Sequence, residues 1–172
     1  MKLNKLREQA VDLLEPGETI EAAAKVTPRG AAHEAILGGA GAVGGLAADG
    51  VLVGAGAALG AKAGAADGQA GRDEREAAGL DVGMATQVIF AVTDRRIVLF
   101  KRSAFGKPKE VLAALEREHV TTVELGTSTL LGQTMPEIQL ALASGAEAGF
   151  GVAKIDRRDG EAVVAALDLG ST

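Results

Sequence analysis

A glycine-rich segment, residues 34–71, constrains most strongly how this chain of 172 residues can fold. It holds 12 of the 24 glycines, and Asp49 is the only charged residue between Ala35 and Ala61, so it is not an ordinary loop. Strand-like sequence lies on both sides of the segment. If those strands pair, the chain must leave the sheet and return to it at the same edge. A single membrane crossing is therefore excluded, and the pattern favours a hairpin over a disordered stretch.

The glycines of this segment recur with a spacing suited to helix packing. Four-residue spacing aligns them on one face of a helix, where another backbone can approach closely. A glycine inside a helix costs roughly 1 kcal/mol relative to alanine, so such helices need a tight packing partner. The predicted packing positions are Gly41, Gly45, Gly56, Gly60, Gly64 and Gly68. A flexible linker is the alternative, although linkers seldom carry so many Val and Leu residues.

The rest of the chain is predicted to be mainly β. An amphipathic pattern indicates a helix over Leu3–Leu14, a charged stretch indicates a helical exit at Arg72–Ala78, and Asp159 is expected to cap a helix that ends at Leu167. Alternation of apolar and polar residues predicts strands between them. The expected strands are Glu18–Val26, Thr86–Thr93, Arg96–Lys101, Val111–Leu115, Val120–Leu125, Glu137–Leu142 and Gly149–Ile155.

Two segments carry a family resemblance. The run FAVTDRRIVLF, Phe90–Phe100, precedes a short basic turn and then the run HVTTVE, His119–Glu124. This arrangement resembles the bacterial pleckstrin-homology-like family, over about residues 18–26 and 86–169. The resemblance implies a seven-stranded antiparallel bent barrel with a C-terminal capping helix, to which this chain adds an N-terminal helix and a glycine-zipper hairpin between the first two strands. The expected division is 1–33, 34–71 and 72–172. The family has no shared catalytic residues.

A cluster of basic residues follows the same hairpin. Six cations occur within 15 residues, with no acid among them: Arg95, Arg96, Lys101, Arg102, Lys107 and Lys109. Basic residues near an anionic lipid surface contribute about 1 kcal/mol each, so the cluster is a candidate membrane-binding patch. The more ordinary alternative is a set of solvated strand ends, whose lysines discourage edge-to-edge aggregation.

The sequence gives no support for catalysis, a metal or a cofactor. Gly39, Gly41 and Gly44 match a dinucleotide-binding spacing, but no βαβ unit follows them, and chance matches are expected in such a glycine-rich stretch. His33 and His119 do not lie at metal-ligand spacing, and the chain has no cysteine. The net charge of −5 argues against nucleic acid as a partner. We therefore expect a protein that is not an enzyme.

These patterns predict an interaction module. Its hairpin would mediate self-association or peripheral attachment to a membrane surface. The alternative is a cytosolic ligand-binding or assembly domain without lipid contact. Because no apolar run follows the early basic residues, the chain lacks a secretory signal pattern, and we expect a cytoplasmic protein or one peripheral to the inner face of the cell membrane. No particular small-molecule ligand is indicated.

Overall fold

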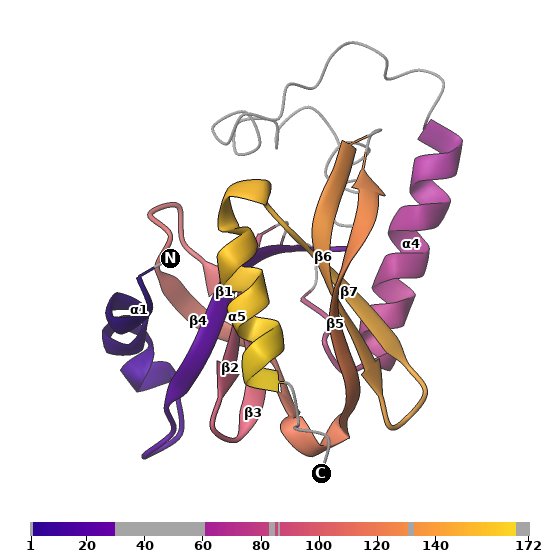
Figure 1. Cartoon of the computed structure of the whole chain (residues 1–172). Coiled ribbons are helices and arrows are strands. Elements are labelled where there is room, and N and C mark those ends of the chain that lie inside the picture. Colours follow the sequence, from indigo (N-terminus) through magenta and orange to yellow (C-terminus); the bar gives the residue numbers. More distant parts are fainter. Residues whose placement is uncertain (1, 30–60, 83–84, 86, 131–132, 168–172) are drawn as a thin grey trace.

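The computed structural model describes residues 2–29, 61–82, 85, 87–130 and 133–167. Its centre is one antiparallel seven-stranded sheet in the order β4-β3-β2-β1-β7-β6-β5, which is open between β4 and β5 (Figure 1). The strands are β1 (Ile20–Pro28), β2 (Val88–Thr93), β3 (Arg96–Arg102), β4 (Pro108–Glu116), β5 (Val120–Leu130), β6 (Gln133–Leu142) and β7 (Glu147–Val152). The described helices are α1 (Leu3–Ala10), α4 (Ala61–Ala77) and α5 (Arg157–Leu167), besides short 3-10 turns. This confirms the predicted pleckstrin-homology-like architecture of seven antiparallel strands with an N-terminal and a C-terminal helix, whereas most of the predicted hairpin between the first two strands lies outside the described residues.

The two strands that flank the glycine-rich segment pair with each other. In the β1–β2 register, Ala22 lies opposite Val92 and Ala24 opposite Phe90. The other edge of β1 pairs with β7, where Val26 lies opposite Val152. Because β1 and β2 are antiparallel neighbours, the chain leaves the sheet after β1 and returns before β2 at the same end of the strands. The geometric expectation from the sequence is confirmed.

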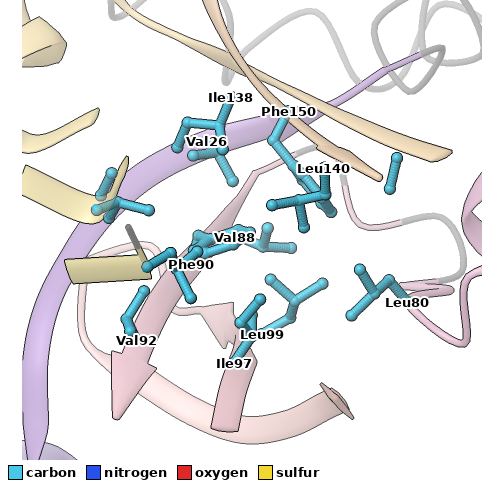
Figure 2. Close-up of a cluster of buried hydrophobic side chains, with 14 of the residues drawn as sticks. Val26, Leu80, Val88, Phe90, Val92, Ile97, Leu99, Ile138, Leu140 and Phe150 are labelled. Carbon is cyan, nitrogen blue, oxygen red and sulfur yellow. The ribbon is translucent and has the colours of Figure 1, made fainter. Parts of the chain in front are cut away.

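The main core lies between the inner faces of the bent sheet and α5 (Figure 2). Phe90 of β2 and Phe150 of β7 meet edge to face, with ring centroids 5.2 Å apart and an interplanar angle of 73°. Val163 and Leu167 of α5 close the core from the side. The remaining buried side chains are mostly Val, Ile, Leu and Ala, so this pair of rings is the only large aromatic contact among the described residues.

A second apolar cluster lies on the outer face of the first half of the sheet. The helix α1 places Leu6 and Ala10 against Ile89 of β2 and Phe100 of β3, and all of these residues are buried. As a result, every residue of β2 is buried, on both faces of the sheet. The N-terminal helix predicted from the sequence is therefore the cover of a second, smaller core. It ends at Ala10, and a 3-10 turn at Val11–Leu13 follows it.

The helix α4 ends with a turn that depends on glycine. Gly79 has φ +68°, a left-handed conformation that residues with a Cβ rarely adopt. The Leu80 amide donates to the Arg75 carbonyl at 2.8 Å, and the Gly79 amide donates to the Glu76 carbonyl at 3.0 Å. This is the helix-ending motif in which a glycine follows the last turn. It directs Leu80 into the main core, where its side chain is fully buried.

Several boundaries differ from those expected. The exit helix starts at Ala61 and not at Arg72, so it runs through the expected boundary at residue 71. The β5–β6 hairpin is longer than predicted, because β5 continues to Leu130 and β6 begins at Gln133. The helix α5 begins at Arg157, which places Asp159 inside its first turn and not at the cap, so that prediction was wrong.

Candidate functional site

The structure divides the six predicted basic residues into two groups. Arg95 and Arg96 lie at the β2–β3 turn, whereas the other four lie at the β3–β4 hairpin, at the opposite end of β3. A strand rises roughly 3.3 Å per residue, so the two turns are about 20 Å apart along the seven residues of β3. The six cations therefore do not form one continuous patch, and each turn has its own environment.

At the β2–β3 turn, Arg96 forms a buried ion pair with Glu18. Arg96 Nε donates to Glu18 Oε1 and Arg96 Nη2 to Glu18 Oε2, both at 2.9 Å, and the Glu18 side chain is 0% exposed. The Thr93 hydroxyl donates to the same carboxylate at 2.8 Å and accepts the Arg96 amide at 2.9 Å. We call these three residues the Glu18 cluster. It fastens the segment before β1 to the β2–β3 turn, so the family-like Thr-Asp-Arg-Arg run has a structural role here.

The electrostatics of the Glu18 cluster reflect this pairing. Burial alone would raise the pKa of Glu18, but hydrogen bonds from Arg96, the Glu15 amide and Thr93 outweigh burial and lower the pKa from 4.5 to about 2. The same contacts raise the pKa of Arg96. The neighbouring Arg95 is 47% exposed and contacts Glu15 at 3.5 Å. Neither arginine is thus a free cation available to a ligand.

The β3–β4 hairpin is a tight loop with a defined shape. The Gly106 amide donates to the Ser103 carbonyl at 2.8 Å, and the Ser103 amide donates to the Lys107 carbonyl at 2.8 Å. The Lys107 amide also donates to the Ser103 hydroxyl at 3.0 Å. Gly106 has φ +77°, as the residue after a type I turn in a three-residue hairpin loop requires. The loop conformation is therefore fixed by its own hydrogen bonds.

This hairpin tip displays one large apolar side chain among cations. Phe105 is 92% exposed, although the chain has only four phenylalanines and the other three are buried. Lys107 and Lys109 are exposed and make no ion pair with any residue of the described chain, whereas Lys101 contacts Glu110 at 2.7 Å. We call Lys101–Glu110 the basic tip. It contains Lys101, Arg102, Lys107 and Lys109 against Glu110, a net charge of 4 − 1 = +3 on a chain of net charge −5.

The basic tip lies at the end of the sheet where β2 begins. Val88, the first residue of β2, pairs with Val26 on one side and with Lys101 on the other. The Arg102 side chain donates to the side-chain oxygen of Gln87, the residue just before β2. The four cations of this tip were among the residues predicted from the sequence, whereas Phe105 was not. An aromatic residue inside a Gly/Lys turn, in a chain so poor in aromatics, was the available signal.

A separate polar network fixes α4 to the outer face of the sheet. Arg29 donates to both carboxylate oxygens of Glu137, at 3.0 and 2.7 Å, and the Glu137 side chain is 2% exposed. Arg29 also contacts Glu74 of α4 at 3.4 Å, and Arg75 of α4 donates to the Arg29 carbonyl. These contacts raise the pKa of Arg29, mainly through Glu137. A hollow of about 100 Å³ beside Arg29 and Gln139 is small for a ligand site, since such pockets usually exceed about 300 Å³.

Gly149 of β7 provides the space for Arg29. A Cβ at Gly149 would lie 2.6 Å from Arg29 Nε, whereas a Cβ at Gly151 would meet only the Thr27 carbonyl, at an ordinary 3.6 Å. We expect Gly149→Ala to displace Arg29, leave the buried Glu137 with only its hydrogen bond from Gln139 and lower the free energy of unfolding by about 1–3 kcal/mol. Faster hydrogen exchange in α4 would accompany this loss. Gly151→Ala is the matched control and should change stability little; equal effects of the two substitutions would contradict the role given to Arg29.

The predicted helix-packing glycines are only partly placed. Gly64 and Gly68 lie on α4, whereas Gly41, Gly45, Gly56 and Gly60 lie outside the described residues. The packing role of all six glycines stays a prediction. His119 lies in a 3-10 turn before β5, and no cluster of three metal-ligating side chains occurs among the residues described. Within the same residues, no helix has the length and apolar character needed to span a bilayer.

No protein-family model matches the sequence, and no curated protein is significantly similar to it. Among solved structures, the chain is similar to a pleckstrin homology domain from Shewanella amazonensis SB2B. The TM-score is 0.45 and the sequence identity 12%, over 98% of this chain and 100% of that chain. The strand order and the closing helix described above define the fold independently of this similarity.

Proposed function

We propose that this domain is a non-enzymatic interaction module that attaches peripherally to anionic membrane surfaces through the basic tip. The observation that carries the proposal is Phe105, exposed at the end of a hydrogen-bonded hairpin and flanked by lysines that form no ion pair within the part of the chain the structure describes. An apolar side chain that enters the acyl boundary, together with cations at headgroup level, is the usual combination for interfacial binding. On an acidic protein, this local positive charge also orients the tip toward the membrane.

The expected affinity of one tip is modest. Each basic residue near an anionic surface contributes about 1 kcal/mol, and burial of a phenylalanine side chain contributes roughly 1.5–3 kcal/mol when complete. Lys101 already contacts Glu110, so its contribution is smaller than that of Lys107 or Lys109. The sum corresponds to reversible attachment, sensitive to salt and to the anionic lipid content. The alternative function, a cytosolic assembly domain without lipid contact, predicts no binding to any vesicle.

Vesicle sedimentation tests the charge contribution. We expect the protein to bind vesicles of phosphatidylcholine with phosphatidylserine, and not vesicles of phosphatidylcholine alone. Lys107→Glu with Lys109→Glu should weaken this binding at least about 30-fold, because two attractive charges become repulsive. The matched control is Lys2→Glu with Lys5→Glu, two exposed lysines of the α1 region. Both double variants change the net charge from −5 to −5 − 4 = −9, so only position distinguishes them.

A second pair of variants tests the apolar contribution. Phe105→Ser should weaken binding about tenfold or more, whereas Val11→Ser, at another exposed apolar position, should leave binding unchanged. Wild-type protein that stays in the supernatant with anionic vesicles would support the cytosolic alternative. Equal losses in the tip variants and their controls would show that binding depends on overall charge or on another surface.

A further inference from the structure

The two edges of the sheet differ in their protection against pairing with another strand. The edge strand β4 carries Pro108, Lys109, Glu110 and Glu116, and prolines and charges are residues that block strand addition. The other edge strand, β5, is the longest strand described, and Glu124 is its only charged residue. It contains no lysine, arginine or proline. The β4 edge thus carries residues that block strand addition, and the β5 edge does not.

The β5 edge is also accessible. Among the strands that the structure describes, only β6 pairs with β5, and Thr122, Glu124, Thr127 and Thr129 are all exposed. The β6–β7 register begins at Glu137, so the part of the β5–β6 hairpin beyond Gly126 projects past β7 as a two-stranded ribbon (Figure 1). The one irregularity in β5 lies between Val120 and Thr122, at its beginning. From Thr122 onward the pairing with β6 is regular, and the opposite edge has no strand partner within the described ranges. The inner face of the strand contacts α5, and Leu125 packs against the main core there.

The sequence of β5 is complementary to itself when it runs antiparallel about Leu125. In that register, Thr122 lies opposite Ser128, Val123 opposite Thr127, and Glu124 opposite Gly126 of a second copy. Hydroxyl pairs across strands stabilise a sheet, and the one acidic residue meets a glycine and not another acid. Each residue keeps its own face of the sheet, because paired positions have the same parity. We propose that β5 pairs with β5 of a second copy of this chain, centred on Leu125, to form a two-fold symmetric dimer.

This proposal is independent of membrane attachment and of the glycine-rich segment. A closed two-fold contact uses the same surface on both partners. Once two β5 edges have paired, neither is free to bind a third copy, so the assembly stops at a dimer. The other edge, β4, would remain protected by its own residues. The charge effect is small, since Glu124 is the only ionisable group in the paired stretch.

A charge-exchange experiment tests the register directly. Thr122→Lys with Ser128→Lys places lysine opposite lysine twice in the proposed dimer, whereas Thr122→Lys with Ser128→Glu places lysine opposite glutamate twice. Within one chain the two positions lie opposite Ala141 and Met135 of β6, which are uncharged. Both variants carry Thr122→Lys, so any effect of the charged neighbours of Thr122 within the chain, Arg29, Glu124 and Glu147, is common to both. We expect sedimentation equilibrium to show a dimer for wild type and for the Lys/Glu variant, with the Lys/Lys variant dissociating at least about tenfold more readily.

A cysteine pair provides a second readout. The chain has no cysteine, so Leu125→Cys introduces a single thiol on the proposed two-fold axis, where opposite Cα atoms lie about 4.5–5.5 Å apart, within disulfide range. Mild oxidation should therefore give a covalent dimer. Glu124→Cys is the control, because it is more exposed but would face Gly126 of the partner, so it should crosslink poorly. A monomeric wild type, equal dissociation of the two charge variants, or stronger crosslinking through position 124 would overturn the proposal.

Discussion

Replacement of Arg96 by methionine is expected to lower the free energy of unfolding by about 3–5 kcal/mol. Arg96→Met keeps most of the apolar stem but removes both hydrogen bonds to Glu18, whose carboxylate is completely buried. Removal of one partner of a buried ion pair leaves an uncompensated charge, which costs far more than the pair contributes when intact. Urea denaturation at neutral pH measures this loss.

Arg95→Met is the matched control, one residue away. Arg95 is half-exposed and contacts Glu15 at 3.5 Å, so its loss should cost less than about 1 kcal/mol. If the two variants unfold at the same urea concentration, the Glu18 cluster does not have the energetic role that its geometry indicates.

The same cluster should make stability depend on pH. The pKa of Glu18 is lowered to about 2 in the folded protein, so its ionised form stabilises the fold above about pH 4.5, and this contribution is lost as the pH falls from 4.5 toward 2. We expect the loss to be about 1–3 kcal/mol, since solvent near the turn screens part of the interaction. Glu18→Gln should lack this component, and a variant that keeps the full wild-type pH dependence would assign it to other carboxylates.

Phe90→Ala should have the second large effect, again about 3–5 kcal/mol. Phe90 is fully buried and contacts Phe150 edge to face, in a core built otherwise from aliphatic side chains. Truncation of a buried aromatic ring removes its transfer free energy and leaves a cavity that small neighbours fill only partly. Domains typically have a total stability of about 5–15 kcal/mol, so this variant should lose a large share of it and unfold at a clearly lower temperature and urea concentration than wild type.

Phe105→Ala makes the same chemical change on the surface and serves as the control. Its ring is 92% exposed, so the thermal midpoint should stay close to that of wild type while vesicle binding falls. This pair of variants separates folding from attachment. A large loss of stability in Phe105→Ala would show that the ring is packed in solution and would remove the main support for the basic tip as a membrane contact.

Local patterns predicted much of the sheet. The β2–β3 hairpin was expected at Thr86–Thr93 and Arg96–Lys101, and the structure has Val88–Thr93 and Arg96–Arg102. In this hairpin, the alternation of apolar and polar residues, the β-branched residues and a tight Asp-Arg turn all predict the same structure. The end of β5 was missed because the run Gly126–Thr129 contains no apolar residue, and the start of β6 was missed because Pro136 argues against a strand.

Long-range partners explain why the candidate site was predicted only in part. The six cations looked continuous because they lie close in the sequence, but the partner of Arg96 is Glu18, 78 residues earlier. No local pattern shows that an arginine is already paired. The contacts of α4 were missed for a similar reason: Glu74 in its C-terminal half contacts Arg29, which pairs with Glu137, and neither partner is near the helix in sequence.

The position of α1 has a consequence for the order in which this protein assembles. Leu6 and Ala10 share a buried cluster with Phe100, so the helix is synthesised about 90 residues before its docking surface is complete. An isolated helix of eight residues is unstable in water, so on the ribosome this segment should remain unfolded until β3 has emerged. The second apolar cluster, on the outer face of the sheet, would then form late in synthesis. A nascent chain stalled before residue 100 should leave α1 accessible to proteases.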